Sequence, residues 1–180
     1  MDDGSRAPEM TDLVEQHYSL LYRIAYRLTG SVADAEDLTQ QAFLTAQRKL
    51  HQLREPSNAR AWLCTIVKNA FFKSCRTRHD EVVSLERVAE PTLSSPEEVF
   101  VDREELQHLL DELPEEFRVP LVLFYFGELT YKDIAEQMDV PMGTIMSRLA
   151  RGKAHLRNRL TQTEVAGQRR PVSTAAAANL

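Results

Sequence analysis

Residues 130–157 read TYKDIAEQMDVPMGTIMSRLARGKAHLR, and this stretch decides the fold of the second half of the chain. Thr130 and Asp133 form a T-x-x-D capping box, which predicts the start of a short helix. A turn is expected at 138–141, MDVP, because proline suits the first turn of a following helix. On that second helix one apolar side is formed by Ile145, Leu149, Gly152, Leu156 and Leu160. The pattern predicts a helix-turn-helix.

The opposite side of the second helix carries groups that could read DNA. Thr144, Ser147 and Arg151 point away from the apolar side, and Arg148 lies on its flank. Arginine can hold guanine through O6 and N7, whereas serine and threonine suit bases or phosphates. Lys153, Arg157 and Arg159 lie further along and are expected to contact phosphate or solvent. The alternative is a solvated basic face on an ordinary helical hairpin.

Charge is segregated along the chain, whose formal total is −5. Residues 11–78 carry ten basic and six acidic side chains, a net +4. Residues 79–98 carry one and six, a net −5, and residues 99–128 carry two and eight, a net −6. Residues 129–162 carry six and three, a net +3. Two basic segments therefore flank an acidic middle, a distribution that says more about partners than the total does.

The composition excludes several classes of protein. No apolar run approaches the roughly 18–20 residues that cross a bilayer, and the polar N-terminus has no signal-peptide core. A cytoplasmic protein without membrane insertion is the expectation. Cys64 and Cys75 lack metal-site or redox spacing and are expected to be buried apolar groups. With scattered histidines and no nucleophile or phosphate-loop motif, the sequence predicts no enzyme, no catalytic residue, no metal and no cofactor.

Helical periodicity covers nearly the whole chain, so we expect an all-α protein of two small helical domains. Helices are expected from Leu13 to a stop at Gly30, from the capping residue Ser31 to Leu50, and from about Ala59 to Arg78, after Asn58 as N-cap. Periodicity resumes at Val99. The expected organisation is a first domain at 11–78, an acidic linker at 79–98, a helix-turn-helix domain at 99–162 and a disordered tail at 163–180.

The third predicted helix has a polar face of its own. Thr65, Asn69 and Arg76 lie within about 40° of one another at 100° per residue, away from the apolar side. An amide and a guanidinium on one exposed face can contact an unpaired base and a phosphate together. Trp62 lies on the apolar side and is expected to be a core aromatic.

Four collinear segments within about 11–162 resemble the extracytoplasmic-function sigma factors. The segment that reads the promoter −35 element in that family looks like LTYKDIAEQMDVPMGTIMSRLARGKAHLR. The helices before that segment look like LPEEFRVPLVLFYFGELTYKDIA. DAEDLTQQAFLTAQRKL resembles the helix that binds RNA polymerase, and NARAWLCTIVKNAFFKSCRTR the helix that reads the −10 element. A lone helix-turn-helix would be a much weaker signal.

The resemblance implies roles for individual residues of the helix-turn-helix. Ser147 and Arg151 match positions that contact −35 bases, and Arg148 matches a position that contacts the DNA backbone. Met146 stands where many members have Lys or Arg, and Ala150 where some have an aromatic residue. Both departures are expected to weaken direct readout at those positions.

The resemblance also implies roles in the first domain. Asp37, Gln40 and Gln41 match the polymerase-facing positions, and they lie off the apolar stripe of their helix, although members often have an acid at the position of Gln41. Asn69 matches the asparagine that contacts the −10 element, and Arg76 matches a basic position of the same helix.

In two places around the −10 helix the implied roles are less direct. Lys73 stands where the family often has an acid or an amide. The loop Leu53–Asn58 corresponds to the place where members pocket a flipped promoter base.

The expected function is that of a sigma factor, which binds core RNA polymerase and recognises the −35 and −10 elements of promoter DNA. Members are commonly held by an anti-sigma factor, although no residue here identifies one. The acidic linker could thread through positively charged polymerase channels or act as a flexible tether. The rival interpretation is a stand-alone helix-turn-helix regulator of operator DNA, which explains 129–162 but leaves 34–49 and 58–78 without a role.

Overall fold

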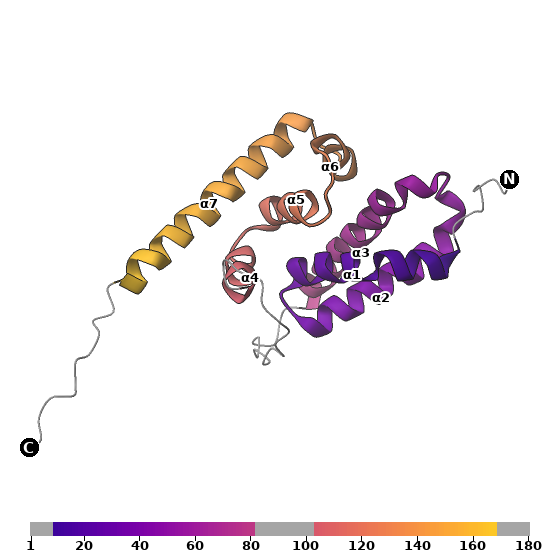
Figure 1. Cartoon of the computed structure of the whole chain (residues 1–180), viewed down its shortest axis with the longest axis horizontal. Coiled ribbons are helices and arrows are strands. Elements are labelled where there is room, and N and C mark those ends of the chain that lie inside the picture. The colour runs from indigo at the N-terminus through magenta and orange to yellow at the C-terminus, as the bar shows by residue number, and fades with distance from the viewer. Residues whose placement is uncertain (1–8, 82–102, 169–180) are drawn as a thin grey trace, which may run out of the picture.

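The computed structural model describes residues 9–81 and 103–168, and every regular element in these two ranges is a helix. The first unit contains α1 (Met10–Thr29), α2 (Val32–Lys49) and α3 (Ala59–Glu81), with two 3-10 turns, Leu50–Gln52 and Pro56–Asn58, between α2 and α3 (Figure 1). The second unit contains α4 (Arg103–Asp111), α5 (Glu115–Tyr125), α6 (Tyr131–Met138) and α7 (Met142–Gln168). The predicted all-α, two-domain fold with a helix-turn-helix is confirmed.

The first unit is a three-helix bundle whose corners follow local sequence signals. Gly30 ends α1 at a left-handed φ of 70°, a conformation that costs glycine little, and its N–H donates to the Tyr26 carbonyl at 2.8 Å. The Ser31 hydroxyl then accepts from the Asp34 N–H at 3.3 Å and caps α2. Asn58 differs from the prediction, because it lies in a 3-10 turn and its side-chain amide donates to Glu55.

The second unit owes its helix-turn-helix geometry to α6 and its turn. The capping box predicted at Thr130 and Asp133 is present in both directions. Asp139 ends α6 at a left-handed φ of 53°, and the Val140 N–H donates to the Ala135 carbonyl at 3.1 Å. At Gly152 the helices α5 and α7 approach so closely that a Cβ would lie 2.6 Å from a Leu121 methyl carbon. This close approach fixes where α7 crosses the domain.

Two predicted boundaries differ from the structure at their described ends. α3 continues to Glu81, into the segment 79–98 that was predicted as a linker. α7 continues to Gln168, into the segment 163–180 that was predicted as a disordered tail, because helical hydrogen bonding continues there without an apolar stripe. The rest of the predicted linker and tail lies outside the described residues.

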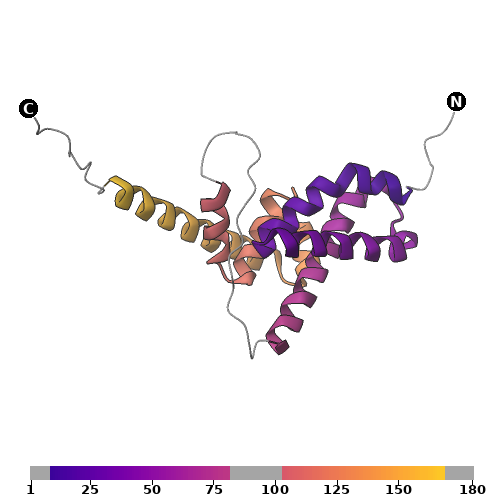
Figure 2. The same ribbon diagram turned by 90° about the horizontal axis from the view of Figure 1, so that it is seen from below.

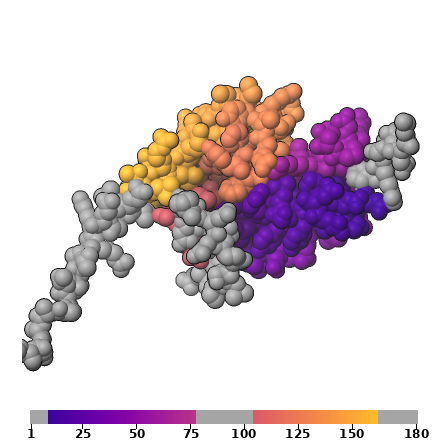
Figure 3. Space-filling model, viewed as in Figure 1, coloured from indigo at the N-terminus to yellow at the C-terminus, as the bar shows by residue number. Residues whose placement is uncertain are grey.

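The two units pack against each other, and their buried side chains form one continuous cluster. α1 contacts α4 and α5 across the boundary. Figure 3 shows the second unit lying directly on the first, without a gap between their surfaces. The far ends of α3 and α7 extend away from this body in different directions (Figure 2). The described chain is therefore a closed, two-unit arrangement.

Candidate nucleic-acid and polymerase interfaces

The first candidate interface is the α7 face, which we define as Thr144, Ser147, Arg148 and Arg151. Burial of Ile145 and Leu149 against the second unit fixes which side of α7 is outward. Ser147 and Arg151 are exposed there, whereas Thr144 and Arg148 are half-buried. The Arg148 guanidinium lies 3.7 Å from the carboxylate of Glu116, in the same unit. Such a partly exposed pair contributes little stability and leaves the guanidinium able to exchange partners.

The basic residues further along α7 divide into two kinds. Lys153 and Arg157 are exposed, as expected for groups that contact phosphate or solvent. Arg159 instead makes two hydrogen bonds to Glu112, Nε to Oε2 at 2.7 Å and Nη2 to Oε1 at 2.6 Å. These bonds hold the pKa of the Glu112 carboxyl below its ordinary value. The Arg159 side chain therefore ties α7 to the residue after α4, a role that the sequence did not predict.

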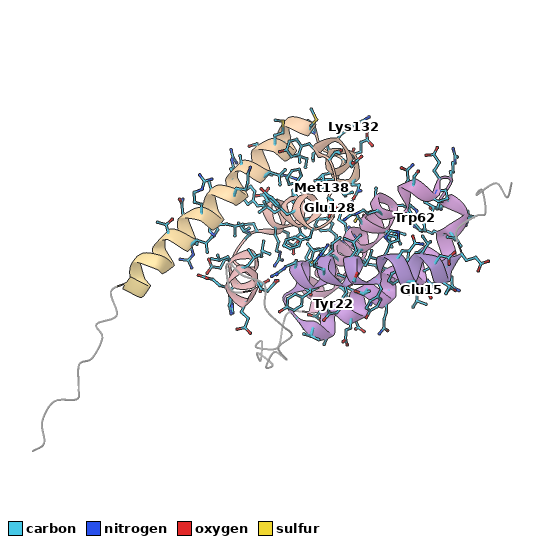
Figure 4. All side chains as sticks on the ribbon, viewed as in Figure 1. Glu15, Tyr22, Trp62, Glu128, Lys132 and Met138 are labelled. Carbon is cyan, nitrogen blue, oxygen red and sulfur yellow. The ribbon has the colours of Figure 1, made fainter. Side chains whose placement is uncertain are left out.

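The second candidate interface is the α3 face, Thr65, Asn69 and Arg76. Asn69 and Arg76 are exposed, and Thr65 is half-buried. The Thr65 hydroxyl donates to the Ala61 carbonyl at 3.0 Å, so it contributes mainly as an acceptor to any outside ligand. Trp62 is partly buried against the core (Figure 4), near to its predicted role as a core aromatic.

The third candidate interface is the α2 face, Asp37, Gln40 and Gln41, and all three side chains are exposed. Leu44 continues the same stripe one turn later and is 52% exposed. Leu44 was not among the predicted residues. The sequence does contain a signal for it, because Leu44 lies three positions after Gln41 and four after Gln40, on the polar side of α2 and not on its buried side. An apolar side chain within a polar surface suits contact with a protein partner.

A buried polar pair joins the two units. The Arg27 guanidinium donates to the Gln107 side-chain oxygen at 3.2 Å, and the Gln107 amide donates back to the Arg27 carbonyl at 3.4 Å. Both residues are less than a tenth exposed. The same guanidinium lies 5.3 Å from the centre of the Phe126 ring, which supports it as a cation–π partner. Buried side chains thus hold α1 against α4 and against the end of α5.

Two further contacts tie α3 to the second unit. Arg60 donates to Glu128 at 2.5 Å, and this hydrogen bond lowers the pKa of the Glu128 carboxyl. Figure 4 shows Glu128 between the two units. Lys68 is 6% exposed, and its amine donates to the Gln137 carbonyl in the last turn of α6. Burial lowers the pKa of Lys68, while the negative end of the α6 dipole favours its charge. The second unit therefore covers the flank of the α3 face next to Asn69.

Other groups that could form a site include the buried thiol of Cys64 and side chains able to bind a metal ion. Cys64 is buried, and burial raises the pKa of its thiol to about 12, so it stays protonated. In the ranges 9–81 and 103–168 the His, Cys, Asp and Glu side chains form no group of three that could hold a metal ion. None of the helices in these ranges combines the length and apolar character required to cross a membrane.

Comparison with known families places both units. The family model described as sigma-70 region 2 matches residues 13–80, and the model described as sigma-70, region 4 matches residues 103–156. Among curated relatives, the ECF RNA polymerase sigma factor SigE of Mycolicibacterium smegmatis is 36% identical over 89% of this chain and 65% of its own length. The ECF sigma factor SigW of Bacillus subtilis is 30% identical over 83% of this chain and 87% of its length. The chain thus spans somewhat less than two thirds of the first relative and most of the second.

Solved structures extend the similarity to the arrangement of both units. The sigma factor RpoE of Bartonella quintana, solved in complex with the anti-sigma factor NepR, matches 84% of this chain at a TM-score of 0.72 and 28% identity, over 98% of that chain. CnrH, solved with the cytosolic domain of CnrY, shares the fold at a TM-score of 0.60 and 19% identity, over 85% of this chain and 88% of its own. The chain therefore belongs to the ECF sigma factors, sigma-70-family proteins that bind core RNA polymerase and direct transcription initiation at specific promoters.

Proposed function

We propose that the three exposed faces divide the work of promoter recognition. The α7 face reads the −35 element, with Ser147 and Arg151 on base edges and Arg148 on the backbone. The α3 face holds the −10 element, with Asn69 on an unpaired base and Arg76 on phosphate. The α2 face binds core RNA polymerase. The observation that carries this assignment is that polar side chains are exposed on three separate helices while the apolar sides of the same helices are buried. Of the assigned residues, Arg148 alone is half-buried, on the flank of the α7 face.

The closed arrangement cannot hold both promoter elements at once. Elements named for positions −35 and −10 lie about 25 base pairs apart, or about 85 Å along B-DNA at 3.4 Å per pair. In the closed arrangement Lys68, next to Asn69 on α3, contacts Gln137, a few residues before the start of α7, so the α3 face and the α7 face lie much closer together than that. The units must therefore separate on the promoter, and the chain at 82–102 is long enough to span up to about 70 Å. Separation would also release Lys68 beside Asn69, on the side that faces promoter DNA.

A partner that stabilises the closed form would keep the protein inactive, and the RpoE–NepR complex offers a precedent for such a partner. We accordingly propose an anti-sigma factor for this chain. The protein acts in the cytoplasm, where polymerase and DNA are found, and performs no chemistry itself: polymerase forms the bonds, and this chain positions it. The three faces supply hydrogen bonds and charge for binding.

The test of the polymerase face is co-elution with core enzyme. A variant that combines Asp37→Ala, Gln40→Ala and Gln41→Ala is expected to co-elute at least tenfold less than wild type, while keeping its helical circular dichroism. The matched control is Lys132→Ala, an exposed residue at the outer end of α6 (Figure 4). Equal loss in both variants, or unchanged co-elution of the triple variant, would place the polymerase contact elsewhere.

A further inference from the structure

The start of α7 carries two large apolar side chains that the fold does not bury. Met142 is 52% exposed and Met146 is 49% exposed. They lie one helical turn apart, next to the buried side formed by Ile145 and Leu149 but outside it. Because the two side chains are neighbours, they form an exposed apolar patch at the start of α7, and an apolar patch rimmed by polar residues is typical of a contact surface.

Small and exposed residues lie around these methionines on the surface of α7. A Cβ at Gly143 would meet no atom within 4 Å, and Ala150, one turn after Met146, is exposed. Ser147 and Arg151 lie beside this strip on the same outward surface. Because Gly143 and Ala150 are small, the Met146 side chain stands clear of the helix surface between them and can reach the floor of a groove.

The charges beside the strip indicate what covers it. Lys153 and Arg157 follow on the same edge of α7 and are exposed, so the apolar strip continues into cationic groups spaced along the helix. That combination is complementary to duplex DNA, where the major-groove floor is flanked by phosphates. Within the major groove the one apolar group on a base edge is the C5-methyl of thymine.

We infer that Met146, supported by Met142 one turn earlier, contacts a thymine C5-methyl in the −35 element and so sets the base preference at that position. The inference rests on the proposed placement of the α7 face in the −35 major groove. Where a Lys or Arg would read guanine, the thioether of Met146 favours an A·T pair. Flexibility suits methionine to this contact, because its unbranched chain adjusts to the methyl position.

The experiment uses reconstituted holoenzyme and a DNA library, so the promoter sequence itself is one of its results. Selection from a library with a randomised −35 element, by wild type and by Met146→Ala, identifies an A·T position whose enrichment depends on Met146. Each thymine at that position is then replaced by deoxyuridine, which removes the methyl and leaves every hydrogen-bonding group. Wild-type binding is expected to fall about three- to fivefold, as for one buried methyl. Met146→Ala should not distinguish thymine from deoxyuridine, and Met146→Leu should restore most of the difference.

Controls separate failure of this inference from failure of the proposed function. Lys153→Ala, on a residue expected to touch phosphate, should weaken binding to thymine and deoxyuridine DNA equally. If scrambling the −35 element and Arg151→Ala reduce binding but deoxyuridine has no effect, the methyl contact is wrong and the −35 assignment stands. If Met146→Ala reduces co-elution with polymerase instead, the strip is a protein contact and the inference is also wrong. If the scrambled −35 element is bound as tightly as the selected one, the proposed function fails.

Discussion

Removing the Gln107 side chain should open the closed arrangement. In Gln107→Ala the buried Arg27 guanidinium loses a charge-assisted hydrogen bond of 3.2 Å, and the Arg27 carbonyl loses an amide donor. A hydrogen bond to a charged group contributes about 1.5–3 kcal/mol. Because Arg27 keeps its contact with Phe126, we take about 2 kcal/mol, which shifts the equilibrium between closed and open forms about 30-fold. An open form populated at about 1% would rise to about a quarter of the molecules.

The assay is single-molecule energy transfer between one dye on each unit. Exposed positions for the dyes are Gln47→Cys on α2 and Lys153→Cys on α7, in a Cys75→Ser background. Cys64 can remain, because its buried thiol, with a pKa of about 12, will not label. The low-transfer population should rise to about a quarter of the molecules in Gln107→Ala and stay near the wild-type level of about 1% in the control Gln52→Ala, whose side chain is exposed. Identical histograms for wild type and Gln107→Ala, with both proteins folded, would refute the view that this buried pair holds the units together.

Three further outcomes are expected. Arg151→Ala should cost about 1–3 kcal/mol of discrimination at one −35 base pair, measured as the binding ratio of selected to scrambled promoter; an equal loss on both DNAs would reduce the residue to a phosphate contact. Asn69→Ala should lower permanganate reactivity of the −10 thymines at saturating holoenzyme, and unchanged reactivity would contradict its role on the open strand. In an NMR titration Glu128 should have a pKa below its ordinary value of 4.5, so that its pair with Arg60 is fully formed above 4.5 and is lost as the pH falls through the lowered pKa. Arg60→Ala should return the Glu128 pKa towards 4.5, and no change would contradict the pairing.

Local signals predicted the helices well, because their causes lie within a few residues. Gly30 supplies the left-handed φ that ends α1, and Thr130 with Asp133 closes the first turn of α6. The outward position of Ser147 and Arg151 follows from the same helical period that buries Ile145. Such features do not depend on the rest of the chain.

The packing of one unit on the other had no local signal. Arg27 and Gln107 are 80 positions apart. From the sequence alone, each polar side chain is expected on the solvent-exposed side of its own helix. Lys68 is similar, since a lysine on a helix beside an exposed asparagine is normally in water, yet here it reaches a carbonyl of α6. These groups are buried only because two separately predictable domains meet, and their partners follow only from the three-dimensional arrangement.

The ends of α3 and α7 were also not predicted from the sequence pattern. Both helices continue beyond the residues where the apolar pattern stops, at Glu81 and Gln168. Once a helix is nucleated, each added residue gains a hydrogen bond, so a helix can continue without an apolar stripe. Periodicity therefore locates the packed part of a helix better than its end.

The central claim is that this chain recognises promoters as a subunit of polymerase and not alone. A gel-shift titration of promoter DNA, selected with holoenzyme, tests this directly, with free protein in one arm and protein plus core polymerase in the other. The closed arrangement and the acidic segments 79–98 and 99–128 predict weak, salt-sensitive binding by the free protein and tight, sequence-specific binding only with core enzyme. Specific nanomolar binding by the free protein, unchanged by core polymerase, would contradict it.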